Sequence, residues 1–146
     1  MKSASIYLKD GVIRIIPHAK TTEGLTKNVG PVFFLQETDP STVIGQKTLE
    51  ALALFGKVIP HPKNQEEWKA SESEWCQAMK IKSWRTFAKN AKVLGIEMDG
   101  DSISIIPTRN MLPKRGFEWL QHKSRTSTAD PEELGRVIIE AFDDCE

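Results

Sequence analysis

The three histidines are the first residues to test for chemistry, because a histidine ring can move a proton or bind a metal near neutral pH. They are His18, His61 and His122, and no two of them stand four positions apart, as paired ligands on one helix face would. His18 has Glu23 nearby, which makes it the best acid–base candidate if the chain is a small enzyme or a ligand-binding domain. We expect His61 and His122 to be ordinary loop side chains.

Other signatures of a catalytic or cofactor site do not occur. The nine glycines stand singly and form no phosphate-binding loop, and the sequence contains neither an HExxH motif nor a nucleophile-elbow motif. Cys76 and Cys145 have no neighbour at metal-ligand spacing, so we expect two free thiols. We therefore predict a protein that is not an enzyme and that holds no cofactor and no metal.

An acidic segment and an aromatic segment favour binding to another protein. The letters EMDGD place Glu97, Asp99 and Asp101 within five residues, which is too short a spacing for a calcium loop. Carboxylates in such a turn either face solvent or dock on a basic partner.

The aromatic segment is RNMLPKRGFEW. It carries Arg115, Phe117 and Trp119, and aromatic residues and arginine are the types enriched at interface hot spots. Trp119 could equally pack in the core. We predict the three acidic residues of EMDGD and these three side chains as the binding residues.

A repeat positions these segments. IRIIPHAK, residues 13–20, returns 90 positions later as ISIIPTRN, residues 103–110. An Asp-Gly turn stands just before each copy, and apolar residues alternate with polar ones on both sides of that turn. This pattern predicts two β-hairpins. Each hairpin is expected to end at a proline, Pro17 or Pro107, since proline lacks the N–H that a strand ladder uses.

A short strand and a helix are expected after each hairpin. PVFFLQ, residues 31–36, is apolar enough for a strand buried on both faces, whereas the polar HKSRTST, residues 122–128, can form only an edge strand. DPSTVIG and DPEELG predict helix starts, with Asp39 and Asp130 as N-caps and a proline at the first helical position.

These elements predict an α+β fold of pseudo-duplicated hairpin, strand and helix units. The units form a mainly antiparallel sheet backed by helices. We expect one domain over residues 1–146, with a first unit at 1–56, a helical insert at 57–91 and a second unit at 92–146. Two short helices, in EWCQAMKI and SWRTFAKNA, are expected to bridge the units. If the chain is instead a small enzyme or ligand-binding domain, its pocket would lie between the two units.

Charge and hydropathy limit the partners. The chain has 20 basic and 20 acidic residues, which argues against a nucleic-acid binder, since such domains usually carry a basic excess. The acidic excess falls on residues 92–146, with seven basic and eleven acidic side chains. No apolar run suits a membrane span or a signal peptide. We expect a cytoplasmic monomer that meets neither membrane nor nucleic acid.

The chain resembles the contact-dependent growth inhibition (CDI) immunity protein family, CdiI. The segments IIPHAKTTEG, KSWRTFAKNAK, ISIIPTRN and DPEELGRVIIEAF carry the resemblance and span nearly the whole chain. It implies a cytoplasmic protein that neutralises the C-terminal toxin domain of a large exported effector, commonly a nuclease, by covering its active site. It transfers no individual binding residue. Relatives that face basic nucleases are often acidic, whereas this chain is neutral, so its acidic C-terminal third is the expected docking face.

Overall fold

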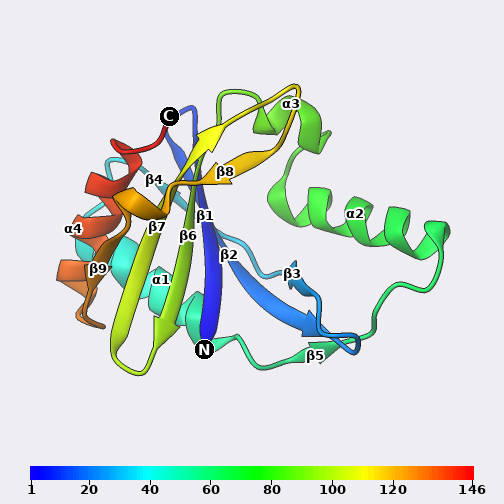
Figure 1. Ribbon diagram of the computed structural model, residues 1–146, viewed down its shortest axis with the longest axis horizontal. Helices are drawn as coiled ribbons and strands as arrows, with labels where there is room; N and C mark the ends of the chain where they lie inside the picture. The colour runs from blue at the N-terminus through cyan, green and yellow to red at the C-terminus, as the bar shows by residue number, and fades with distance from the viewer.

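The computed structural model describes all residues, 1–146, as a nine-stranded sheet with four α-helices (Figure 1). The strands are β1 (Lys2–Lys9), β2 (Val12–Thr21), β3 (Thr26–Asn28), β4 (Phe33–Gln36), β5 (Val58–Ile59), β6 (Lys92–Asp99), β7 (Ser102–Asn110), β8 (Phe117–Trp119) and β9 (Arg125–Ser127). The helices are α1 (Ser41–Ala53), α2 (Gln65–Met79), α3 (Trp84–Ala88) and α4 (Pro131–Phe142), and a 3-10 turn spans Gln121–Lys123. None of the helices is both long and apolar enough to cross a membrane.

Both predicted hairpins are confirmed. β1 pairs with β2 and β6 pairs with β7, each antiparallel. Asp10 and Gly11 turn the first hairpin with φ of 52° and 78°, and Gly100 helps to turn the second with φ of 61°. Glycine and aspartate tolerate such left-handed conformations better than most residues, which explains why Asp-Gly occurs at both turns.

The two hairpins join through an antiparallel pairing of β1 with β6 at the centre of the sheet. In this pairing Ser5 lies opposite Gly95, which is its own counterpart 90 positions later. Ile6 lies opposite Leu94, the counterpart of Ala4, and Ala4 lies opposite Ile96, the counterpart of Ile6. The register is therefore symmetrical about the Ser5–Gly95 pair. The sequence repeat thus becomes a pseudo-twofold fold, and the predicted α+β class of duplicated units is confirmed.

The prolines do not end the hairpins as predicted. β2 runs through Pro17 to Thr21, and β7 runs through Pro107 to Asn110. The carbonyl of Pro17 accepts a hydrogen bond from Val29, between the residues of β2 that pair with β4 and those that pair with β3. A proline is tolerated at this position because it lies in a gap between two neighbouring strands, where a backbone N–H would have no partner in either ladder.

Pro107 lies in the equivalent gap between β9 and β8, and its carbonyl accepts from Leu120. Both short strands after the hairpins are edge strands, since β4 pairs only with β2 and β9 only with β7. The polar edge strand predicted in residues 122–128 is confirmed. The prediction that residues 31–36 are buried on both faces is wrong, because Phe33 and Phe34 are only half-buried.

The two helix starts differ. In α4 the Asp130 side chain accepts from the N–H of Glu133 at 3.0 Å, and Pro131 opens the helix, as predicted. In α1 the N-cap is Pro40, and no side chain caps the helix. The predicted cap Asp39 instead accepts from the N–H of Gln36 at 2.8 Å. One extra residue precedes the matching glycine in the first copy, and this insertion moves Asp39 out of the capping position.

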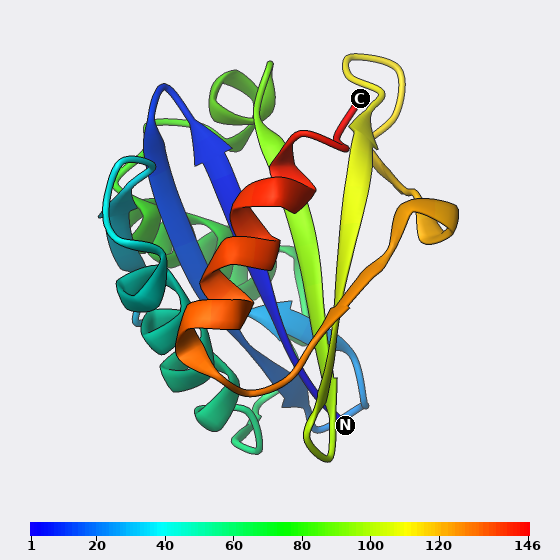
Figure 2. The ribbon, with the colours of Figure 1, turned by 90° about the vertical axis from the view of Figure 1, so that its left-hand side faces the viewer.

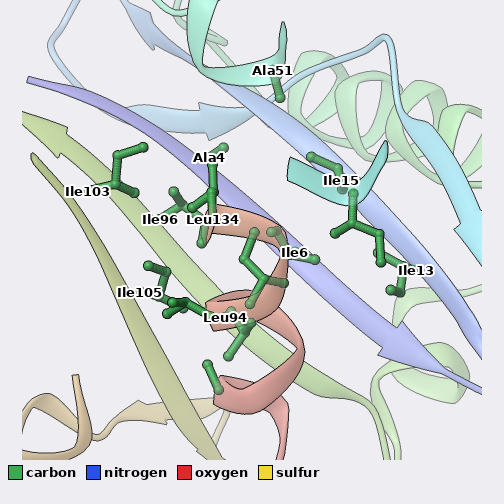
Figure 3. Close-up of a cluster of buried hydrophobic side chains, with 14 of the residues drawn as sticks. Ala4, Ile6, Ile13, Ile15, Ala51, Leu94, Ile96, Ile103, Ile105 and Leu134 are labelled. Carbon is green, nitrogen blue, oxygen red and sulfur yellow. The ribbon is translucent and has the colours of Figure 1, made fainter. Parts of the chain in front are cut away.

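Helices α1 and α4 lie side by side on one face of the sheet (Figure 2). Between them and the sheet lies the main core, in which isoleucines of β1, β2, β6 and β7 meet the apolar faces of both helices (Figure 3). Burying one such isoleucine contributes roughly 1.5–3 kcal/mol. The labelled core residues include Ala4, Ile6, Ile13, Ile15, Leu94, Ile96, Ile103, Ile105 and Leu134.

The insert covers part of the opposite face, which we call the insert face. The prediction of two short helices there is wrong in one respect, because α2 is a single helix of 15 residues that Asn64 caps and that ends at Met79. Ser83 caps α3 as expected, accepting from the N–H of Thr86. A second hydrophobic cluster packs the insert on the sheet. It consists of Tyr7, Ile16, Met79, Phe87 and Val93, and Trp75 and Trp84 pack against it.

Candidate functional site

The insert face carries a histidine held by two serines. His18 lies on β2, and its Nδ1 is 2.8 Å from Ser3 Oγ while its Nε2 is 2.7 Å from Ser5 Oγ. The serines stand two apart on β1, so both point to this face. Burial lowers the His18 pKa to about 4, and a hydrogen bond with the Asn28 side chain opposes that change. The ring is therefore neutral and fixed in place near neutral pH.

Beside this histidine, β6 brings Gly95 opposite Ser5. A Cβ built on Gly95 would meet the ring of Trp119 at 2.4 Å, so the indole of Trp119 lies directly on the glycine backbone. Trp119 reaches this position because β8 pairs with β7, with Trp119 opposite Thr108. Trp119 is nevertheless 51% exposed, which corrects the alternative that it packs in the core.

Two of the three predicted carboxylates share this face. Glu97 stands two residues after Gly95, opposite Ser3 on one side and Ser104 on the other. Asp99 follows at the end of β6, and Asp101 lies in the turn beyond it. All three carboxylates are exposed, and none of them forms an ion pair.

The other acidic residues of the C-terminal third are differently engaged. Arg109 and Lys123 hold Glu146, and their hydrogen bonds lower its pKa to about 2. Arg125 binds Asp144 at 2.7 Å and reaches Glu140 at 3.2 Å. Arg109, Lys123 and Arg125 are committed to these pairs, and no salt bridge reaches Glu97, Asp99 or Asp101, so the β6–β7 end keeps an uncompensated negative charge.

The remaining predicted residues lie elsewhere. Arg115 is exposed in the loop between β7 and β8, at the opposite end of β7 from the acidic turn. Phe117 is half-buried and contacts Trp84 of α3, with ring centroids 6.4 Å apart. The structure thus brings Glu97, Asp99 and Trp119 to the insert face. Phe117 lies on that face too, but in the part that α3 covers, and Arg115 lies in the loop before β8.

Sequence reasoning missed the role of Ser3, Ser5 and Asn28. The available signal was the i, i+2 serine pair on a predicted strand opposite the strand of His18. That pair predicts which face the serines share, but the register that aligns them with His18 is set by the turn length and by the core on the other face.

The other two histidines lie apart from His18. His61 Nδ1 is 2.9 Å from Thr21 Oγ1, and its Nε2 is 2.9 Å from a Glu23 carboxylate oxygen. Thr21 is buried and its hydroxyl also accepts from two backbone N–H groups, so this contact fastens a loop. His122 is exposed in the 3-10 turn. No three His, Cys, Asp or Glu side chains converge as metal ligands would, and both cysteines are free.

Two cavities lie near the insert, and His18 does not line either of them. One of about 540 Å³ lies between α2 and the segment from β3 to Gly30. Another of about 600 Å³ lies between α3, the start of β6 and the C-terminal residues, lined by Arg85, Lys89 and Lys92. His18 lines neither, and its ring nitrogens face serine hydroxyls where the enzyme alternative needs converging carboxylates.

Two solved structures share this fold. A protein of unknown function from Neisseria meningitidis, NMB0488, superposes with a TM-score of 0.76 at 16% identity, over 99% of this chain and 95% of that one. A chain of a CdiA-CT/CdiI toxin and immunity complex from Yersinia pseudotuberculosis superposes with a TM-score of 0.77 at 16% identity, over 99% of this chain and 97% of that one. Comparison with curated proteins gives no match.

A protein-family model matches the chain over nearly its whole length. The model of CdiI, the CDI immunity protein, matches residues 2–145, which is nearly the whole chain. Its match includes both repeat units, the insert and the whole insert face. The chain therefore belongs to the CDI immunity protein family.

Proposed function

We propose that this protein binds the C-terminal toxin domain of a CDI effector and neutralises it by covering the active site. The match to the CDI immunity protein family over residues 2–145 is the observation that carries the proposal. The fold neighbour taken from a CdiA-CT/CdiI toxin and immunity complex is consistent with it. The protein acts in the cytoplasm, as a monomer, by steric occlusion, and needs no reactive group of its own.

The toxin is a nuclease in this proposal. A nuclease must hold the phosphate backbone, so its substrate cleft carries lysine and arginine. The uncompensated carboxylates Glu97, Asp99 and Asp101 offer the complementary charge. Opposite potentials raise the rate of encounter and orient the partner. The exposed Trp119 is the aromatic anchor, and Arg115 and Phe117 were the further contacts predicted from the sequence.

The test uses the purified protein and the toxin domain encoded directly upstream of it. Calorimetric titration should give a 1:1 complex with submicromolar affinity. Cleavage of RNA and DNA by the toxin should then fall in proportion to the immunity protein added, with full inhibition at equimolar amounts. An absence of binding at micromolar concentrations would overturn the proposal. Tight binding that leaves cleavage intact would overturn only the occlusion of the active site.

A further inference from the structure

We propose that the toxin docks on the uncovered half of the insert face, seating a basic segment between Trp119 and His18. This half, which we call the open sheet face, consists of Ser3, His18, Gly95, Glu97, Ser104 and Trp119. The inference rests on the proposed function and assigns it a surface. It also divides the residues predicted from sequence, because Arg115 and Phe117 lie outside this face.

The open sheet face is the part of the sheet that no helix covers. Helices α1 and α4 pack on the other side, and in Figure 1 the strands β1 and β6 pass in front of α1. On the insert face, α3 and the end of α2 cover the half around Tyr7 and Val93. The other half of the same strands stays accessible, with Ser3, His18 and Ser104 half-exposed and Glu97 exposed.

The floor of this face is small and fixed. Beside His18 the two central strands carry Ser3, Ser5 and Gly95, and His18 is held from both ring nitrogens by the serine hydroxyl groups. Gly95 lies under Trp119 and Ser5 is buried, so a partner would meet the His18 ring and Ser3. Little side-chain entropy is lost on binding there because the ring is already ordered. Such a floor suits a rigid contact that need not rearrange.

Trp119 provides the raised border. Its ring rests on Gly95, so one side of the indole is supported by backbone while half of the side chain remains exposed. Tryptophan in such a position buries a large apolar area on binding and is typical of interface hot spots. Trp68 on α2 is similarly exposed, at 40%, but it lies outside this face. It therefore serves as a matched control.

Charge selects the chemistry of the partner. Glu97 and Asp99 lie on the same face of β6, and neither has a cation within ion-pair distance. Lys20 follows His18 by two residues on β2, a strand that β1 separates from β6 and its carboxylates. An arginine or lysine of the toxin that enters beside Trp119 would therefore reach Glu97 with no competing cation next to it.

The experiment compares four variants of the full chain in calorimetric titration against the toxin domain. Trp119→Ala should weaken affinity at least 30-fold, and Glu97→Lys at least tenfold. Trp68→Ala and Glu37→Lys, which remove an exposed indole and reverse an exposed carboxylate away from the face, should change affinity less than threefold. Circular dichroism checks that each variant folds.

A second measurement needs no variant. In amide and indole NMR spectra of the labelled wild-type protein, the Trp119 indole N–H should shift or broaden on addition of unlabelled toxin, while the Trp68 signal stays. An unshifted Trp119 signal in a formed complex would overturn the assigned surface and leave the proposed function standing. A loss of binding in Trp68→Ala with normal binding in Trp119→Ala would do the same. Failure of the wild-type protein to bind at all would instead remove the proposed function and the surface with it.

Discussion

Gly45 of α1 touches the carbonyl group of Pro131 in α4, so closely that a Cβ on Gly45 would lie 1.8 Å from that oxygen. The reciprocal contact exists 90 positions later, where a Cβ on Gly135 would lie 1.7 Å from the carbonyl oxygen of Ser41. The helices thus cross backbone to backbone at two symmetrical points. Glycine allows this approach, and the approach lets both helices reach the same core.

Alanine at either position should destabilise the fold. An exposed glycine-to-alanine change in a helix normally stabilises by about 1 kcal/mol, because alanine has the higher helix propensity. At Gly45 and Gly135 the new methyl group would meet backbone that cannot rotate away, so we expect a loss of about 1–3 kcal/mol in each variant. Chemical denaturation measures it, and the double variant should cost less than the sum, since one displacement of the helices relieves both contacts.

Gly116→Ala is the control, because no atom lies within 4 Å of its Cβ position and its φ is not positive. It should leave stability within about 0.5 kcal/mol of wild type. If Gly45→Ala were as stable as Gly116→Ala, the close crossing of the helices would not exist in solution.

Gly95→Ala should have a different outcome from the same chemical change. Here the methyl group would meet the ring of Trp119, which is an exposed side chain and can swing away. We expect a stability change below that of Gly45→Ala and a red-shifted Trp119 fluorescence, since the indole leaves its backbone support for water. Subtracting the spectra of Trp119→Ala variants isolates this signal. A fluorescence difference of zero would show that Trp119 does not rest on Gly95.

Much of the fold could be predicted because local signals and the repeat agree. The Asp-Gly turns and strand alternation identify both hairpins, and the offset of 90 identifies the counterparts. The wrong predictions concern positions where a single inserted residue, or a change of the neighbouring strand, determines the local structure. Asp39 loses its capping role through a single extra residue, and the prolines keep their strands because the neighbouring strand changes beside them.

The open sheet face was harder to predict because its residues meet only through non-local pairing. Trp119 reaches Gly95 after a loop whose path the letters RNMLPKRG do not specify, and His18 meets Ser3 only in one strand register. The length of α2 was a different kind of miss. QEEWKASES is rich in strong helix formers, but its nearness to Pro60 and Pro62 left a loop or a short helix as the interpretation, whereas Asn64 caps a helix that begins just beyond the prolines.

Lys9→Met should loosen the insert. Lys9 Nζ donates to the carbonyl oxygens of Thr86, Phe87 and Lys89 at 3.0, 2.8 and 2.6 Å, so β1 holds the end of the five-residue helix α3. Carbonyls at a helix C-terminus favour a cation, and losing these bonds should cost about 1–2 kcal/mol. Hydrogen exchange should quicken in residues 84–91. The exposed Lys82→Met is the control, and equal exchange in both variants would contradict the tether.

Charge reversal at the acidic turn tests steering. Asp99→Lys and Asp101→Lys should slow association with the toxin several-fold at low ionic strength and leave dissociation less affected, since exposed charges act mainly on encounter. The difference from wild type should shrink at 0.5 M salt, where the Debye length is only about 4 Å. Stopped-flow mixing measures both rates, and an unchanged association rate would show that Asp99 and Asp101 do not steer the toxin.

The pH dependence of stability should reveal the buried state of His18. Its folded pKa is about 4, against an ordinary value of 6.5, so between these values the unfolded chain takes up a proton that the folded chain excludes. The stabilising contribution is therefore complete above pH 6.5 and is lost as the pH falls toward 4. We expect a loss of about 2 kcal/mol, less than the full shift implies because the ring is partly exposed. His18→Gln can still bond to the serines but has no titrating ring, so its free energy of unfolding should fall less between pH 7 and pH 4.5 than that of wild type. Parallel pH profiles for the two proteins would mean that the fold does not lower the pKa of His18, and therefore that the ring is not buried between the serines at the open sheet face.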